Sequence, residues 1–233
     1  MNAAAAPTAA GIPIATTRPA LYPVFLDLVG RRVVVVGGGA VGEEKVEGLL
    51  ETGAEVLLIA RELTSRLSAR VAEGRVELLR RAFRRGDLAG AFLVLAERSD
   101  PETEGEIFAE AQERGIFANV QDRLPRCSFQ APALLRRGDL AVAISTAGSA
   151  PALASRLRRR LEEQLGPEIG ELLAMVGPLR DELSRRFPDF SERKRRWYRL
   201  VDSPVLEELR EGRVEAARKL IRETLGVTPE APP

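Results

Sequence analysis

The sequence predicts an α/β fold in which a doubly wound, mostly parallel sheet is followed by a short antiparallel segment and a run of helices. Four consecutive valines at 33–36 are typical of a strand that is buried on both faces, as in a parallel sheet. Strand-like and helix-like segments then alternate as far as residue 120, and only helical patterns follow residue 151. This order of elements makes the first half of the chain Rossmann-like.

Three glycines follow the first strand at the spacing of a dinucleotide-binding turn. Gly37, Gly39 and Gly42 fit G-x-G-x-x-G, with a strand before them and a helix after them. Gly37 permits the tight turn, Gly39 lets the backbone approach a diphosphate, and Gly42 lets the helix pack closely on the strand. The helix N-terminus adds free N–H groups and a partial positive charge. We therefore expect a bound dinucleotide here, and the alternative is a strand-to-helix turn with a purely structural role.

The other elements of the first half follow from apolar spacing and from the Gly and Pro residues that bound them. A short apolar segment at 22–28 is expected to pack beside the sheet. Strands are expected at 32–36, 55–60, 75–81, 91–96 and 116–120, and helices at 41–52, 63–73 and 101–114.

The second half of the chain has a different rhythm. Strands are expected at 128–132 and 140–145, and they should be antiparallel because no helix separates them. Helices are expected at 152–164, 168–187, 191–201, 204–210 and 213–225. Leucines 153, 157 and 161 form one helical face that needs a partner, which indicates a homodimer; the alternative is that this face folds back on the first domain.

These patterns predict five segments. They are a disordered tail at 1–20, an NAD-binding domain at 21–124, dimerisation strands at 125–150, a helical domain at 151–226 and a tail at 227–233.

Composition excludes several kinds of chemistry. The net charge of +1 gives no reason to expect nucleic acid or a membrane surface as a partner. Histidine is absent, so general acid–base work falls to carboxylates, hydroxyls or tyrosine. Cys127 is the only cysteine, which excludes an internal disulfide and a cysteine metal cluster, and we expect no resident metal. Neither a signal peptide nor a membrane span is indicated, so we expect a cytoplasmic protein.

Two segments at the expected carboxyl ends of strands carry candidate side chains. Arg61 and Glu62 follow the second strand, where an acid binds ribose hydroxyls and an arginine favours a 2′-phosphate. Glu62 lies 20 residues beyond Gly42, which favours NAD over NADP, although a solvated charge pair explains either residue equally well. Asp122 follows the fifth strand and is the best-placed acid–base candidate; the alternative is a turn-forming aspartate.

A third segment lies before the first helix of the second half. Ser145, Thr146 and Ser149 offer hydroxyls, and the helix start offers N–H groups, for an anion or a carboxylate. Arg156 is the arginine of this helix that we expect to face a ligand. The alternative is that Ser149 is an ordinary N-cap with Pro151 in the first turn.

Taken together, six motifs resemble one known family. They are the segments 22–28, 35–41, 44–46, 119–122, 129–133 and 143–156. Their order and spacing resemble the precorrin-2 dehydrogenase and sirohydrochlorin ferrochelatase family, which is also the N-terminal region of siroheme synthase. The resemblance extends from about residue 21 to 165 and more loosely beyond.

The resemblance implies NAD-dependent dehydrogenation of the tetrapyrrole precorrin-2 in a homodimer with interlocking middle strands. Some members also insert Fe²⁺, which makes Fe²⁺ a candidate second substrate. By the same resemblance Gly37, Gly39, Ala40 and Val41 match the pyrophosphate loop, and Arg61 and Glu62 match the ribose end. Asp122 matches the acid–base aspartate, and Thr146 matches a hydroxyl of the tetrapyrrole pocket.

One loop departs from the family's pattern. The family usually has Ala-Ala-Thr-Asp after the fourth strand and an asparagine a few residues on, whereas this chain has Ala96-Glu97-Arg98-Ser99 and Glu104. Two rival hypotheses accompany the enzymatic interpretation, and the altered loop favours the second of them. One is a non-catalytic NAD(H)-sensing module, and the other is a protein that binds and delivers a tetrapyrrole without turnover.

Overall fold

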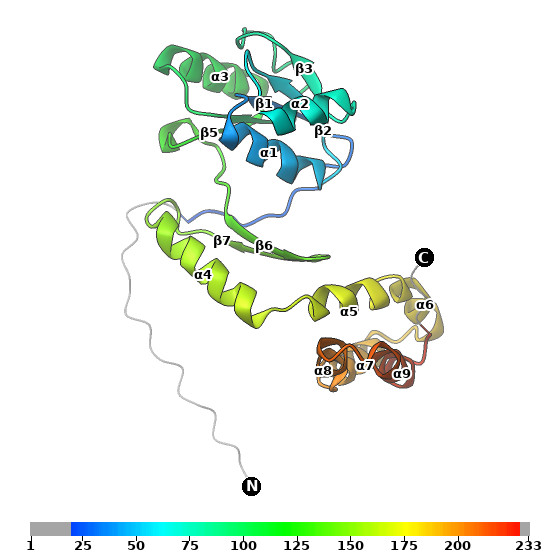
Figure 1. The fold of residues 1–233 in the computed structure, drawn as a ribbon. Helices are drawn as coiled ribbons and strands as arrows, with labels where there is room; N and C mark the ends of the chain where they lie inside the picture. The colour runs from blue at the N-terminus through cyan, green and yellow to red at the C-terminus, as the bar shows by residue number, and fades with distance from the viewer. Residues whose placement is uncertain (1–19, 229–233) are drawn as a thin grey trace. The chain divides into compact units, whose positions relative to one another are not determined.

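The structure is a computed structural model, and it describes residues 20–228 (Figure 1). The predicted tails at 1–20 and 227–233 lie mostly outside these residues, but the prediction is wrong for Val227, which is buried in the apolar cluster of the last helices. The chain divides into two compact units, with the boundary between Cys127 and Ser128. Each unit is described by itself.

The first unit is a five-stranded sheet in the order β3-β2-β1-β4-β5, with every pairing parallel. Its strands are β1 (Arg32–Val36), β2 (Glu55–Ile59), β3 (Glu77–Leu79), β4 (Leu93–Ala96) and β5 (Phe117–Val120). Its helices are α1 (Ala40–Leu50), α2 (Ser65–Ala72), α3 (Pro101–Arg114) and the 3₁₀ turn η1 (Leu124–Arg126). The predicted α/β fold with a parallel sheet is therefore confirmed.

Both faces of this sheet are covered. The crossovers from β1 to β2 and from β4 to β5 run in opposite directions across the sheet, so right-handed connections put α1 and α3 on opposite faces (Figure 1). Val34 and Ile59 point to the α3 face, where they belong to one apolar cluster with Ile107. Val33 and Val35 are equally buried and point the other way, because successive side chains of a strand alternate. This explains why the valine run carries no polar residue.

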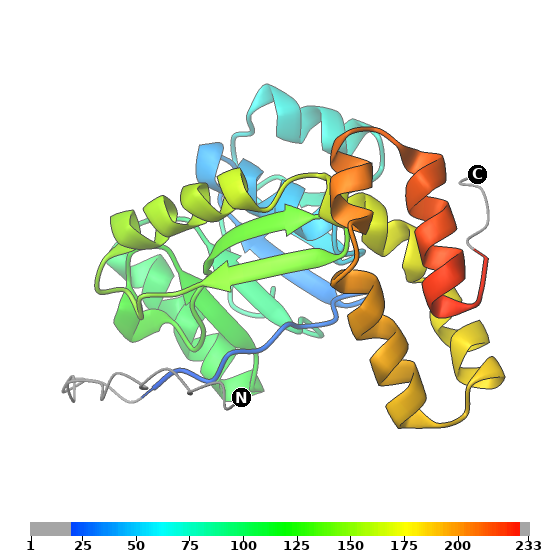
Figure 2. The same ribbon diagram turned by 90° about the horizontal axis from the view of Figure 1, so that it is seen from below.

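The second unit begins with a two-stranded antiparallel ladder of β6 (Ala133–Arg137) and β7 (Leu140–Ile144). Helix α4 (Pro151–Gln164) packs against both strands. The remaining helices are α5 (Glu168–Val176), α6 (Leu179–Arg186), α7 (Phe190–Val201), α8 (Val205–Arg210) and α9 (Val214–Leu225). Figure 2 shows α4 beside the ladder and these helices grouped together, and they share one apolar cluster that includes Leu183, Leu200 and Ile221.

Several predicted elements are wrong in detail. The first strand of the ladder is 133–137 rather than 128–132, because Gly138 turns the chain at a φ of +55° and lets both arginines before it join the strand. The helix predicted at 168–187 is two helices, α5 and α6, because Pro178 lacks an N–H and follows Gly177. The third strand is the three-residue edge strand β3 rather than 75–81.

The segment at 22–28 does not pack beside the sheet as expected. Tyr22 is 87% exposed and Phe25 72% exposed, and only Leu28 is buried. Within residues 20–228, no helix is both long enough and apolar enough to span a membrane.

Candidate active site

The turn between β1 and α1, residues 37–42, is called the glycine loop below. Gly37 has a φ of +118°, which a residue with a Cβ rarely adopts. A Cβ on Gly42 would collide with the backbone carbonyl of Gly37, so the first turn of α1 lies directly against the end of β1. Gly39 is the N-cap of α1 and has no side-chain cap of its own. The amides at the start of α1 are therefore available to an acceptor from elsewhere.

The acceptor in this structure is the side chain of Glu97, which follows β4. Its Oε2 accepts a hydrogen bond from the Gly39 amide at 3.2 Å, and its Oε1 accepts one from the Gly42 amide. The Glu97 amide in turn donates to the Val36 carbonyl at 2.8 Å, which fixes this residue beside the loop. The glycine loop thus holds two anionic oxygens, which is the donor arrangement that a phosphate requires.

The two charged residues after β2 lie beside the glycine loop and are exposed. A Cβ on Gly38 would collide with the carbonyl of Glu62, and the Thr64 amide donates to the Gly38 carbonyl at 3.1 Å. The chain that carries Arg61 and Glu62 therefore follows the edge of the loop closely, while both side chains remain open to solvent.

Asp122 is exposed and is the second residue after β5. Its φ is +57°, a left-handed conformation that aspartate tolerates better than most residues. Because all five strands are parallel, the carboxyl end of β5 lies on the same edge of the sheet as the glycine loop. Arg98 and Gln121 connect the loops after β4 and β5, since the Arg98 amide donates to the Gln121 Oε1 at 3.4 Å.

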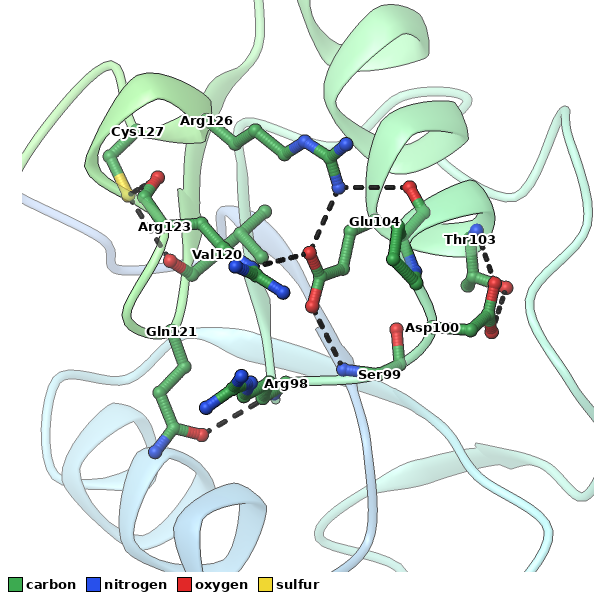
Figure 3. Close-up of polar contacts among 11 residues, drawn as sticks. Arg98, Ser99, Asp100, Thr103, Glu104, Val120, Gln121, Arg123, Arg126 and Cys127 are labelled. Atoms are coloured by element: carbon green, nitrogen blue, oxygen red, sulfur yellow. Dashed lines mark hydrogen bonds and ion pairs between the residues drawn. The ribbon is translucent and has the colours of Figure 1, made fainter.

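A buried carboxylate holds the loop that carries Asp122. Glu104 of α3 has an exposed fraction of 0%, and its Oε1 accepts from the Ser99 amide at 3.1 Å. Its Oε2 accepts from Arg123 Nε and Arg126 Nη1, both at 2.9 Å (Figure 3). We call these four residues the Glu104 cluster. Arg126 Nη1 also donates to the Pro101 carbonyl at 2.9 Å, so the cluster joins the start of α3 to the segment after β5.

The charges of this cluster keep Glu104 ionised. Burial alone raises the pKa of a carboxyl, but the Ser99 amide and the guanidiniums of Arg123 and Arg126 outweigh it and lower the pKa of Glu104. Nearby, the Cys127 thiol contacts the carbonyls of Val120 and Arg123 at 3.2 and 3.3 Å, and burial raises its pKa. Asp122 thus lies between two residues with fixed contacts, Gln121 bonded to the Arg98 amide and Arg123 bonded to Glu104.

The remaining predicted residues lie in the second unit, before and within α4. The N-cap of α4 is Ala150 without a side-chain cap, so the alternative reading of Ser149 as the cap is wrong. Thr146 Oγ1 accepts from the Ala150 amide and Ser145 Oγ from the Ala147 amide, each at 3.1 Å. Arg156 is exposed on α4.

Sequence reasoning did not assign the contacts of Glu97 and Glu104. In the sequence, both residues stand out only as departures from the family's pattern. The available signal for Glu97 is an acid directly after a strand that neighbours β1, which is visible only once the strand order is known. Glu104 lies in a helix rich in acids, and the available signal is its spacing of three and seven residues from Ile107 and Ala111, which puts it on the apolar face of α3.

Three family descriptions match successive parts of the chain. Residues 24–133 match "Putative NAD(P)-binding", residues 137–164 match "Sirohaem biosynthesis protein central", and residues 168–225 match "Sirohaem synthase dimerisation region". Siroheme synthase 1 of Serratia proteamaculans is 36% identical over 203 residues, which are 87% of this chain and 43% of that protein. Siroheme synthase 1 of Pectobacterium atrosepticum is 37% identical over 203 residues, which are 87% of this chain and 42% of that protein.

The chain belongs to the family of the siroheme synthase N-terminal region.

The resemblance drawn from the motifs is thereby confirmed. This chain shares its fold with a solved structure titled "SirC, precorrin-2 dehydrogenase", at a TM-score of 0.72 and 23% identity. The match covers 89% of this chain and 100% of that one. The chain spans less than half the length of the two siroheme synthases named above.

Proposed function

We propose that this protein is an NAD-dependent dehydrogenase that oxidises precorrin-2 to sirohydrochlorin on the path to siroheme. The observation that carries the proposal is the identity of 36–37% to siroheme synthases across 203 residues. The stretch that matches the NAD(P)-binding family, 24–133, contains both the glycine loop and Asp122. The polycarboxylate substrate also suits a chain whose cations are mostly arginine, since guanidinium groups pair well with carboxylates.

The glycine loop fits the diphosphate of a dinucleotide. The amides of Gly39 and Gly42 already pair with the two oxygens of a carboxylate, so they point into one space that an anion can occupy. We assign coenzyme binding to Gly37, Gly39, Ala40, Val41 and Gly42, and the ribose end to Arg61 and Glu62. Glu62 favours NAD over NADP because a carboxylate accepts from ribose hydroxyls and repels a 2′-phosphate. The coenzyme, when bound, accepts the hydride that the substrate loses.

Asp122 is our candidate for the base that accepts the proton the substrate loses together with the hydride. It is exposed at the carboxyl edge of the sheet, and the Glu104 cluster fixes the segment that follows it. In the second unit, Ser145, Thr146, Ser149 and Arg156 are our candidates for binding the carboxylates of the substrate.

We further propose that the protein works as a homodimer in the cytoplasm. The match of residues 168–225 to a dimerisation region supports the dimer. Helix α4 adds a second argument, because Leu153 is 51% exposed and Leu157 is 37% exposed on it.

The test is an absorbance assay for NADH with purified protein, precorrin-2 and NAD⁺, run in parallel with NADP⁺. We expect turnover that prefers NAD⁺, and we expect Asp122→Asn to lose about a hundredfold or more in kcat while it still binds NAD⁺. Binding of both ligands without NADH formation would instead establish a tetrapyrrole-binding or NAD(H)-sensing protein. Fe²⁺ added to the product then tests whether the same protein inserts the metal, with siroheme absorbance as the readout.

A further inference from the structure

The side chain of Glu97 fills the space above the glycine loop. It comes from the end of β4, the strand next to β1, and its carboxylate bridges the amides of Gly39 and Gly42. A Cβ built on Gly39 would lie 3.1 Å from Glu97 Oε1, and one built on Gly37 would collide with the same side chain. What stands next to these glycines is therefore not open solvent but a carboxylate of the protein itself.

This carboxylate imitates the ligand that the loop is built to hold. It offers two oxygens that share one negative charge, and it lies at the positive end of α1. A diphosphate would need the same two N–H groups and the same space, and an amide whose single hydrogen already points at Glu97 cannot donate fully to a second acceptor. The Glu97 carboxylate and the diphosphate would also repel each other if both lay against these amides.

We propose that Glu97 is an intramolecular competitor of the coenzyme, so that the dinucleotide binds only when this side chain leaves the glycine loop. The inference rests on the proposed function, because it concerns the coenzyme site assigned there. Glu97 is half-buried at the rim of the loop, and its side chain has three rotatable bonds, so it can turn outward without a change of fold. The apparent dissociation constant then equals the intrinsic one divided by the fraction of molecules in which the loop is open.

A purely structural cap predicts a different outcome. In that case removal of the carboxylate would lower the stability of α1 and leave coenzyme affinity unchanged or weaker. In our proposal the same removal lowers stability but strengthens binding, because the empty loop no longer has to release an internal anion. Stability and affinity therefore move in opposite directions only if Glu97 competes.

The experiment compares the wild-type protein with Glu97→Ala, Glu97→Gln and Glu44→Ala by calorimetric titration of NAD⁺. Glu44→Ala is the matched control, because Glu44 is an exposed acid in the first turns of α1, the helix whose N-terminal amides Glu97 contacts, and its substitution also removes one negative charge. We expect Glu97→Ala to bind about tenfold more tightly, because the two hydrogen bonds from Gly39 and Gly42 to the carboxylate need not be broken before NAD⁺ binds. Glu97→Gln, which keeps the volume and loses the charge, should fall between, and Glu44→Ala should stay within about twofold of the wild type.

ADP-ribose provides a second reading, since it carries the diphosphate without the nicotinamide. Its affinity should rise by the same factor in Glu97→Ala. Equal or weaker binding of NAD⁺ by both Glu97 variants would overturn the competition and leave the coenzyme site intact. If neither the wild type nor the variants bind NAD⁺ saturably, the coenzyme site itself is refuted, and the competition with it.

Discussion

The substitutions Gly42→Ala and Gly39→Ala should distinguish the packing role of the glycine loop from its role in binding NAD⁺. At Gly42 a Cβ would collide with the backbone carbonyl of Gly37, and neither atom belongs to a flexible side chain. At Gly39 the nearest atoms are the tip of the Glu97 side chain, 3.1 to 3.6 Å away, and the φ of −80° suits alanine. The first substitution must therefore move backbone, whereas the second has to move only a carboxylate.

The magnitudes follow from these contacts. Relief of the collision at Gly42 should cost about 1–3 kcal/mol, and the better helix propensity of alanine returns up to about 1 kcal/mol. We expect Gly42→Ala to destabilise the first unit by about 1–2 kcal/mol and also to weaken NAD⁺ binding, because the donor at position 42 shifts. We expect Gly39→Ala to change stability by about 0.5 kcal/mol or less. Its Cβ nevertheless occupies the side where an anion is held, which should weaken NAD⁺ binding about 10- to 100-fold.

The assay combines urea unfolding with calorimetric titration of NAD⁺ for both variants. Loss of affinity without loss of stability in Gly39→Ala, and loss of both in Gly42→Ala, is the expected pattern. The reasoning is refuted if Gly42→Ala is as stable as the wild type, or if Gly39→Ala binds NAD⁺ with unchanged affinity.

Three further predictions concern the two units. The lowered pKa of Glu104 means that its carboxylate stabilises the fold fully above its ordinary pKa of 4.5 and loses this effect as the pH falls through the folded-state value. Glu104→Gln should therefore lower Tm at pH 7 by about 10 °C and flatten the acid side of the Tm–pH curve; parallel curves would contradict this. Arg210→Met should lower the Tm of the second unit by several degrees, because it leaves Glu168, only 4% exposed, without the guanidinium at 2.7 Å; an unchanged melting curve would argue against it. Leu157→Glu should halve the mass measured by light scattering if α4 contributes to a dimer, and an unaltered mass would remove this face from the interface.

Most of the fold follows from patterns within short stretches. The four valines at 33–36 predict a strand that is buried on both faces. Helix α3 begins at Pro101 and ends before Gly115, as these two residues predict. The sequence predicts the second strand of the ladder but misplaces the first, because Arg136 and Arg137 resemble a polar loop although they belong to β6. Apolar spacing predicts one helix over 168–187, and Pro178 is the residue that breaks it into α5 and α6.

The candidate site was predictable only in part, because its key contacts join residues far apart in the chain. The glycine spacing locates the loop, but the contact between Gly39 and Glu97 spans 58 residues and depends on β4 lying next to β1. The burial of Glu104 likewise depends on two arginines that follow β5. Helical periodicity places Glu104 on the same face of α3 as Ile107 and Ala111, but only the packed tertiary structure shows which groups pair with its carboxylate.

The most direct test of the account is an NMR titration that follows the backbone amides of Gly39 and Gly42 as NAD⁺ is added. We predict that these two resonances shift together and saturate, with smaller changes at Arg61 and Glu62. Saturable shifts confined to other parts of the chain, or none at all, would contradict the claim that the glycine loop binds the coenzyme.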